Sequence, residues 1–265
     1  MSNFKNYVKR FFAISPDYIN QTKQYSQEKK DADLAMLLYL VGVVFLLVLG
    51  IIGSFELIQY TETGEISRGG FLFQWLKPIV VAGFALLFLK IRKQSIATLG
   101  LTRKNISKSL ILAGFCGVAL LLILVLLNVA LGTIENLSFA FLGHFAEAGV
   151  GATILWFARQ IIVVSFTEEL LYRGFMGTRL YGYRKSKIGS IILVAFLFAI
   201  MHFAPGIPGL FMGLDTARQV SSIPFAILNW MLLHVLLHWM YSKHNNIAGP
   251  ILFHVIWNST ALLGL

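Results

Sequence analysis

Seven apolar runs, each 18 residues or longer, constrain the fold of this chain more than any other feature of its sequence. A helix needs about 20 mostly apolar residues to cross the hydrocarbon core of a bilayer. We therefore predict an all-α fold, a polytopic integral membrane helical bundle with about seven transmembrane helices. The runs cover residues 34–58, 71–90, 107–132, 150–177, 188–205, 223–242 and 246–264.

The composition supports lipid as the solvent of most of the chain. Hydrophobic residues make up 57% and charged residues 13%, whereas a soluble domain carries about 25% charged residues. A formal net charge of +10 in a soluble protein would suggest nucleic acid. Here the basic residues flank apolar runs, so we expect membrane lipid and no nucleic acid as a partner. The single cysteine, Cys116, excludes an intramolecular disulfide.

The loop charges predict the orientation. Cytoplasmic loops carry an excess of Lys and Arg, and residues 1–33 hold six of these against four acids. The segment 90–108 is basic, and so is the loop expected after the fourth run, beginning at Arg179. The loops between these carry mainly acids. We therefore predict a cytoplasmic amino-terminal segment (1–33), an uncleaved first helix and a single membrane domain (34–265) in a cell membrane.

Two adjacent carboxylates, Glu168 and Glu169, lie deep in the fourth run. An ionisable group in hydrocarbon costs at least about 2.5–3.5 kcal/mol, so each needs a partner, a wet cavity or a function. On a helix, Glu169 and Arg173 can pair on one face, whereas Glu168 points about 100° away. We therefore expect Glu168 to be unpaired and available as a general base. The alternative is that the three residues form a buried ionic network that only fixes helix packing.

His202 ends the otherwise apolar fifth run. A lone histidine of this kind is more often a packing donor than a catalyst. However, the basic loop near residue 185 is equally far along the chain from Glu168 and from His202. Two antiparallel helices joined there would place both side chains at similar depth, where they can share a water.

His254 and Asn258 are four residues apart in the last run and share a helix face. Two donors at this spacing suit a developing oxyanion, where removing one donor costs roughly 10²–10³ in rate. The alternative is an interhelical hydrogen bond worth about 0.6 kcal/mol. Counting from the predicted loops places His254 shallower than Glu168 and His202, unless the sixth loop is re-entrant or the helix is tilted.

His234 and His238 in the sixth run have the i, i+4 spacing of a zinc-binding helix but lack the glutamate of the H-E-x-x-H motif. They are equally consistent with packing or with lining a cavity. His144 and His244 lie in predicted loops. We assign no role to these four histidines.

Three short motifs follow one another in three late runs. They are Glu168-Glu169-x-x-x-Arg173, Phe198-x-x-x-His202 and His254-x-x-x-Asn258. In this order and at these intervals they resemble the CPBP family, the CAAX-protease and bacteriocin-processing (Abi-type) membrane proteins. The resemblance covers about residues 150–262.

The resemblance implies an intramembrane glutamic endopeptidase. Glu168 with His202 would activate water, and His254 with Asn258 would stabilise the tetrahedral oxyanion. Glu169 and Arg173 would be supporting residues. No metal or other cofactor is implied, with zinc as the runner-up because Glu and His can ligate it. The implied partner is a membrane-associated or hydrophobic peptide or protein substrate.

The family includes eukaryotic enzymes that cleave prenylated CAAX proteins and bacterial members tied to peptide maturation, bacteriocin self-immunity and cell-surface regulation. The compact architecture and the stretch Leu99-Gly100-Leu101 look more like the bacterial branch, so we expect a bacterial cytoplasmic membrane. The competing hypothesis is a non-catalytic membrane scaffold or immunity protein that binds a membrane partner. A weaker third hypothesis is a small transporter whose ionisable residues relay protons.

Overall fold

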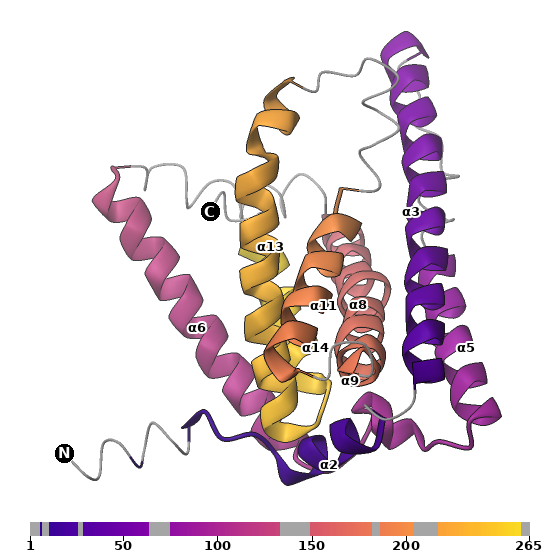
Figure 1. The fold of residues 1–265 in the computed structure, drawn as a ribbon. Coiled ribbons are helices and arrows are strands. Elements are labelled where there is room, and N and C mark those ends of the chain that lie inside the picture. Colours follow the sequence, from indigo (N-terminus) through magenta and orange to yellow (C-terminus); the bar gives the residue numbers. More distant parts are fainter. Residues whose placement is uncertain are drawn as a thin grey trace.

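The computed structural model describes residues 6, 11–25, 29–63, 75–132, 149–181, 186–203 and 217–260. Over these ranges the chain is helical and contains no strand, which confirms the all-α prediction. In chain order the helices are α2 (Pro16–Tyr25), α3 (Lys29–Thr63), α5 (Leu76–Ile91), the short 3₁₀ helix η1 (Ile96–Leu99), α6 (Ile106–Ala130), η3 (Gln160–Phe166), α8 (Thr167–Glu169), η4 (Leu170–Met176), α9 (Gly177–Arg179), α11 (Lys187–Met201), α13 (Ala217–His244) and α14 (Ala248–Thr260) (Figure 1).

Four helical stretches in the described ranges are long and apolar enough to cross a membrane: Lys29–Val48, Ile106–Ala130, Gly149–Arg179 and Pro224–His244. A shorter apolar helix covers Ile188–Met201. The second and seventh predicted spans correspond to α5, of 16 residues, and α14, of 13 residues. The chain is thus a multi-pass helical membrane protein, while the count of seven spans and the cytoplasmic amino terminus stay predictions.

The fourth span, Gly149–Arg179, carries two wide π-helical turns. They are η3 and η4, and the three residues of α8 between them contain both glutamates. Thr167 Oγ1 donates to the carbonyl oxygen of Ile162, five residues earlier, at 3.0 Å. Because π-helical turns are rare and concentrate at functional sites, they indicate that the region around Glu168 and Glu169 is functional.

The carboxyl-terminal half of the fourth span lies inside the bundle, where residues 163–181 are mostly buried. Figure 1 shows α3 and α5 on one side of it, α11, α13 and α14 on the other, and α6 at the far edge. α14 packs against α6 and η3, and α11 packs along α13. The buried core includes Tyr172, Phe175, Phe198 and Phe253, so aromatic side chains from the fourth, fifth and last helices surround the glutamates.

The end of the bundle near α2 is held by a buried polar network. Asp31 pairs with Arg92 at 2.9 Å and accepts from Gln94 at 3.0 Å. Arg179, expected in a loop, is instead fully buried in α9, where it donates to Gln94 at 2.8 Å and lies over the ring of Phe175. The loop prediction for Arg179 is wrong because the fourth helix continues, and neutral acceptors such as Gln94 bond to the buried guanidinium.

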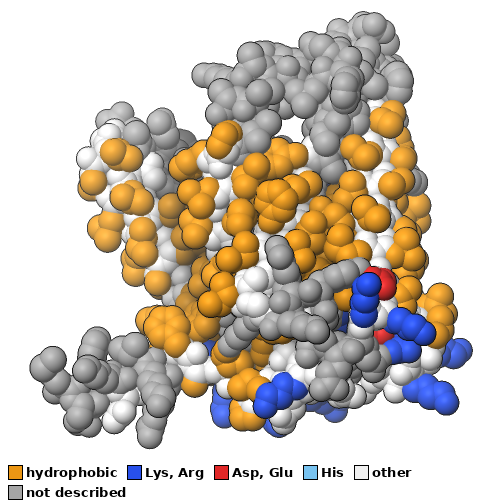
Figure 2. Space-filling view, in the orientation of Figure 1, with side chains coloured by type: hydrophobic (Ala, Val, Ile, Leu, Met, Phe, Trp, Pro, Cys, Tyr) orange, Lys and Arg blue, Asp and Glu red, His pale blue; other side chains and the backbone are white. Residues whose placement is uncertain are grey.

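Charged side chains cluster at that same end of the molecule. In Figure 2, hydrophobic side chains cover the middle of the visible face, and Lys and Arg gather at the lower end, where α2 lies in Figure 1. This distribution is the one that a lipid-exposed belt with a basic rim produces.

A glycine allows the fourth span to approach the segment before α6. A Cβ atom on Gly174 would lie 2.5 Å from the carbonyl oxygen of Leu99, a backbone atom that cannot rotate away. η1 therefore packs directly against η4, next to Arg173.

Candidate active site

Glu169 lies at the centre of a fully buried ion pair. Its Oε1 accepts from Arg173 Nη1 at 2.8 Å, and both side chains are 0% exposed. The predicted pairing across one helical turn is confirmed. The same oxygen accepts from His254 Nδ1 at 2.8 Å, so the carboxylate joins the fourth span to α14.

Glu168 has a cation beside it, which the sequence prediction did not include. Lys77 Nζ, from the first turn of α5, donates to Glu168 Oε1 at 2.8 Å. The expectation that Glu168 is unpaired is therefore wrong. The reason is that its partner comes from a helix 91 residues earlier in the chain, on the face that points away from Arg173.

The second oxygen of Glu168 faces two histidines. Oε2 lies 3.7 Å from His202 Nε2 and 3.9 Å from His254 Nε2, and it has no hydrogen-bond partner in the described part of the chain. The prediction that His202 lies at the depth of Glu168 is confirmed. The depth count that made His254 shallower is wrong, because α14 begins inside the protein: the turn residues before it, Asn246 and Ile247, are buried.

The Nδ1 atoms of both histidines are already engaged. His202 Nδ1 donates to the carbonyl oxygen of Phe198 at 2.8 Å, and the ring stacks on Trp230 with 3.9 Å between centroids. His254 Nδ1 is held by Glu169. Each ring is therefore fixed with its Nε2 atom turned toward Glu168. Such orientation of one histidine nitrogen by a bond at the other is how proteins set the role of an imidazole.

Asn258 lies one turn beyond His254 but contacts a different residue. Its Nδ2 donates to Gln160 Oε1 at 3.1 Å. The structure thus brings five of the predicted residues into one cluster: Glu168, Glu169, Arg173, His202 and His254. Asn258 is instead hydrogen-bonded to Gln160. An amide nitrogen carries two hydrogens, and the bond to Gln160 uses one.

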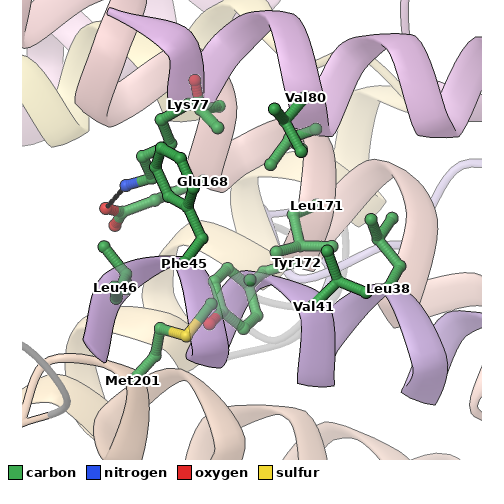
Figure 3. A pocket seen from close by; sticks show the side chains of 13 residues that line it. Leu38, Val41, Phe45, Leu46, Lys77, Val80, Glu168, Leu171, Tyr172 and Met201 are labelled. Carbon is green, nitrogen blue, oxygen red and sulfur yellow. Dashed lines mark hydrogen bonds and ion pairs between the residues drawn. The ribbon is translucent and has the colours of Figure 1, made fainter. Parts of the chain in front are cut away.

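A narrow apolar pocket adjoins Glu168. It lies between α3, α5 and the fourth span, and it leaves about 20 Å³ for the centre of a water-sized sphere, room for about one water. Figure 3 shows the ion pair of Lys77 and Glu168 at one end and mainly aliphatic and aromatic side chains along the rest. The other lining residues are Leu38, Val41, Gly42, Phe45, Leu46, Val80, Val81, Thr167, Leu171, Tyr172 and Met201.

The cluster is a poor fit for zinc. In the described ranges no group of three or more His, Cys, Asp or Glu side chains is arranged to hold a metal ion. The ammonium of Lys77 and the guanidinium of Arg173 already occupy one oxygen of each glutamate. His234 and His238, which have the spacing of a zinc helix, lie outside the cluster, and His144 lies outside the described residues.

Lys77 and Gln160 are the contacts that sequence reasoning missed. Both are polar residues within predicted apolar runs. Lys77 also lies near the start of its apolar run, and the loop charges place that end of the run outside the cell. A lysine there departs from the positive-inside pattern. The rule that an ionisable residue in a span needs a partner would have singled out Lys77, although it would not have named Glu168.

The fold and the cluster define a polytopic helical membrane protein with a buried site of carboxylates, histidines and an arginine. Residues 150–260 match the family model described as type II CAAX prenyl endopeptidase Rce1-like. This region of the chain is similar to the CAAX-protease family, which confirms the predicted resemblance. The family implies a membrane-embedded protease of the CAAX type. Searches of the curated proteins and of the solved structures found no match.

Proposed function

We propose that this protein is an intramembrane endopeptidase in which Glu168 activates water without a metal. The observation that carries the proposal is that His202 Nε2 and His254 Nε2 both lie within 4 Å of Glu168 Oε2. A water can lie about 2.8 Å from both Glu168 Oε2 and a histidine Nε2 that are 3.7–3.9 Å apart. It would then form a hydrogen bond of normal length to each of them.

In the proposed reaction, the water donates one hydrogen to Glu168 Oε2 and the other to His202 Nε2. Its oxygen attacks the peptide carbonyl carbon while Glu168 takes the proton. The carbonyl π electrons move to the carbonyl oxygen and form a tetrahedral oxyanion. Collapse of this intermediate breaks the C–N bond, and Glu168 returns the proton to the leaving amine. One water is consumed and one acid and one amine are formed.

His254 and Asn258 are proposed to stabilise the oxyanion. Since Glu169 holds the Nδ1 hydrogen of His254, donation from Nε2 to the oxyanion would come from the doubly protonated ring. Asn258 would supply its second amide hydrogen. Glu169 and Arg173 are supporting residues that hold His254 in place.

The proposed substrate is a membrane-associated or hydrophobic peptide or protein, because the side chains beside Glu168 on α3 and α5 are apolar. The family match over residues 150–260 supports a protease activity. The bacterial cytoplasmic membrane as its location, and peptide maturation, bacteriocin self-immunity or cell-surface regulation as its role, are further parts of the proposal.

The proposal is tested by cleavage of hydrophobic peptides by the purified protein in detergent, with and without a metal chelator. We expect cleavage to continue at an unchanged rate in excess chelator, because the ammonium of Lys77 disfavours a divalent cation at Glu168. Loss of cleavage in chelator that added zinc restores would show that the site uses a metal.

Lys77 is expected to orient Glu168. Lys77→Met removes the charge-assisted hydrogen bond to Oε1 and frees the carboxylate to rotate, so we expect kcat to fall about tenfold with little change in KM. Lys77→Arg, which keeps the positive charge, should retain more of the activity. Lys90→Met, an exposed lysine on the same helix, is the matched control and should be unchanged. Equal kcat for Lys77→Met and wild type would contradict this role.

A further inference from the structure

His234 is a buried histidine that the proposed chemistry does not use. It lies on α13, is 0% exposed, and neither Nδ1 nor Nε2 has a hydrogen-bond partner in the described part of the chain. Leaving a buried polar group unsatisfied is destabilising, and nearly all such groups in folded proteins bond to protein or ordered water. A leucine would suit this position better if packing were its only purpose.

One side of His234 faces the candidate active site. Its ring lies 5.6 Å from that of Phe198 and 6.4 Å from that of Tyr172. Phe198 in turn contacts His202, with 4.5 Å between centroids, and stacks under the guanidinium of Arg173 at 4.6 Å. Tyr172 Oη and Arg173 Nε and Nη2 are also buried and without a partner among the described residues. Tyr172, whose ring neighbours that of His234, and Arg173, which lies over Phe198, thus also carry polar atoms without a partner in the described ranges.

The other side of His234 leads toward the basic end of the bundle. His238, one turn along α13, is stacked on His234 with 5.9 Å between ring centroids. His238 Nε2 lies 3.0 Å from Tyr18 Oη, on α2. α2 lies across that end of the bundle (Figure 1), and its Asn20, Lys23 and Gln24 are exposed. Tyr18, His238 and His234 thus form a line of polar groups. The line runs from α2 to the aromatic side chains Phe198 and Tyr172.

We propose that Tyr18, His238 and His234 form a water path that supplies the candidate active site from the end of the molecule where α2 lies. The inference rests on the proposed function in one respect: hydrolysis consumes a water for each bond, and the apolar pocket on the α3 side offers room for about one. Water is the ligand that both donates to and accepts from these groups, and it is small enough to reach fully buried side chains. His234 is then a positioning residue, acting through the water it passes on.

The first experiment measures water directly and needs no activity. Radiolytic hydroxyl-radical footprinting oxidises side chains that lie beside ordered water. Tyr172 should be oxidised faster than Tyr39, a matched tyrosine that is also buried but whose Oη donates to the carbonyl oxygen of Leu197. His234→Leu should lower the oxidation of Tyr172 to the level of Tyr39. Equal rates for the two tyrosines in the wild type, or no effect of His234→Leu, would overturn the water path.

The second experiment separates water supply from packing. His234→Leu should lower kcat about tenfold, the effect of losing one hydrogen bond of about 1.4 kcal/mol, with KM nearly unchanged. Its melting temperature should not fall, since a buried histidine that bonds only to water is replaced by an apolar side chain. His234→Gln, which can donate and accept, should recover most of the rate. Leu237→Met, a buried neighbour on α13, is the control.

An unchanged kcat in His234→Leu, or a joint fall of kcat and melting temperature in both His234 variants, would overturn the role of His234. The two experiments also separate this inference from the proposed function. If footprinting succeeds and no peptide is cleaved, the path stands and the peptidase proposal fails. If peptides are cleaved and Tyr172 matches Tyr39, the peptidase proposal stands and the path fails.

Discussion

Glu168→Gln is expected to lower kcat for peptide cleavage by about 10²–10⁴-fold, the range that a general base contributes. The amide has nearly the shape of the carboxylate and still accepts from Lys77, but it cannot take a proton from water. The protein should remain folded and inserted, because the substitution leaves the buried pair of Glu169 and Arg173 intact. The measurement is single-turnover cleavage of a hydrophobic peptide, together with gel filtration of the variant in detergent.

The matched control for Glu168→Gln is Asp17→Asn. It makes the same chemical change at an exposed carboxylate, whose partner Lys104 lies at the surface. Cleavage by Asp17→Asn should equal that of the wild type. Turnover by Glu168→Gln at the wild-type rate would remove Glu168 from the mechanism. If a cellular phenotype of the protein survives in Glu168→Gln while cleavage is lost, the phenotype is due to binding, as the scaffold hypothesis requires.

Local spacing explains the parts of the site that the sequence predicted well. Glu169 and Arg173 are one turn apart on the same helix, so their pairing follows from helix geometry alone. His202 was placed level with Glu168 because the two residues are equidistant from a short basic loop. Both inferences need only neighbouring helices and the rise of 1.5 Å per residue.

Contacts between distant helices were beyond that reasoning. Lys77 reaches Glu168 across 91 residues, and no spacing rule relates α5 to the fourth span. The predicted depth of His254 was wrong for a related reason. Counting residues from the sixth loop assumed that α14 begins at the membrane surface. Instead, Asn246 is buried and donates to the carbonyl oxygens of Thr102 and Lys104, which holds the turn inside the protein. Packing against the segment before α6 set this depth.

Glu169→Gln is expected to be the most destabilising single substitution in the cluster, at about 3–5 kcal/mol, because it leaves Arg173 as an uncompensated buried charge. The glutamine oxygen can still accept from His254. The loss of stability would therefore be due to the missing charge and not to a lost histidine contact. The free energy of unfolding is measured by titrating a denaturing detergent into mixed micelles. Asp17→Asn, which breaks the exposed pair with Lys104, should cost less than about 1 kcal/mol in the same assay.

The double variant Glu169→Gln/Arg173→Met decides whether the charge is the cause. Methionine removes the unpaired guanidinium and keeps a polarizable contact with the ring of Phe198, over which Arg173 lies at 4.6 Å. Replacing a buried ion pair by groups of similar volume is often neutral, so the double variant should regain most of the lost stability. A double variant as unstable as Glu169→Gln would mean that the arginine itself, through its packing, holds the fourth span in place, and that the ion pair is secondary.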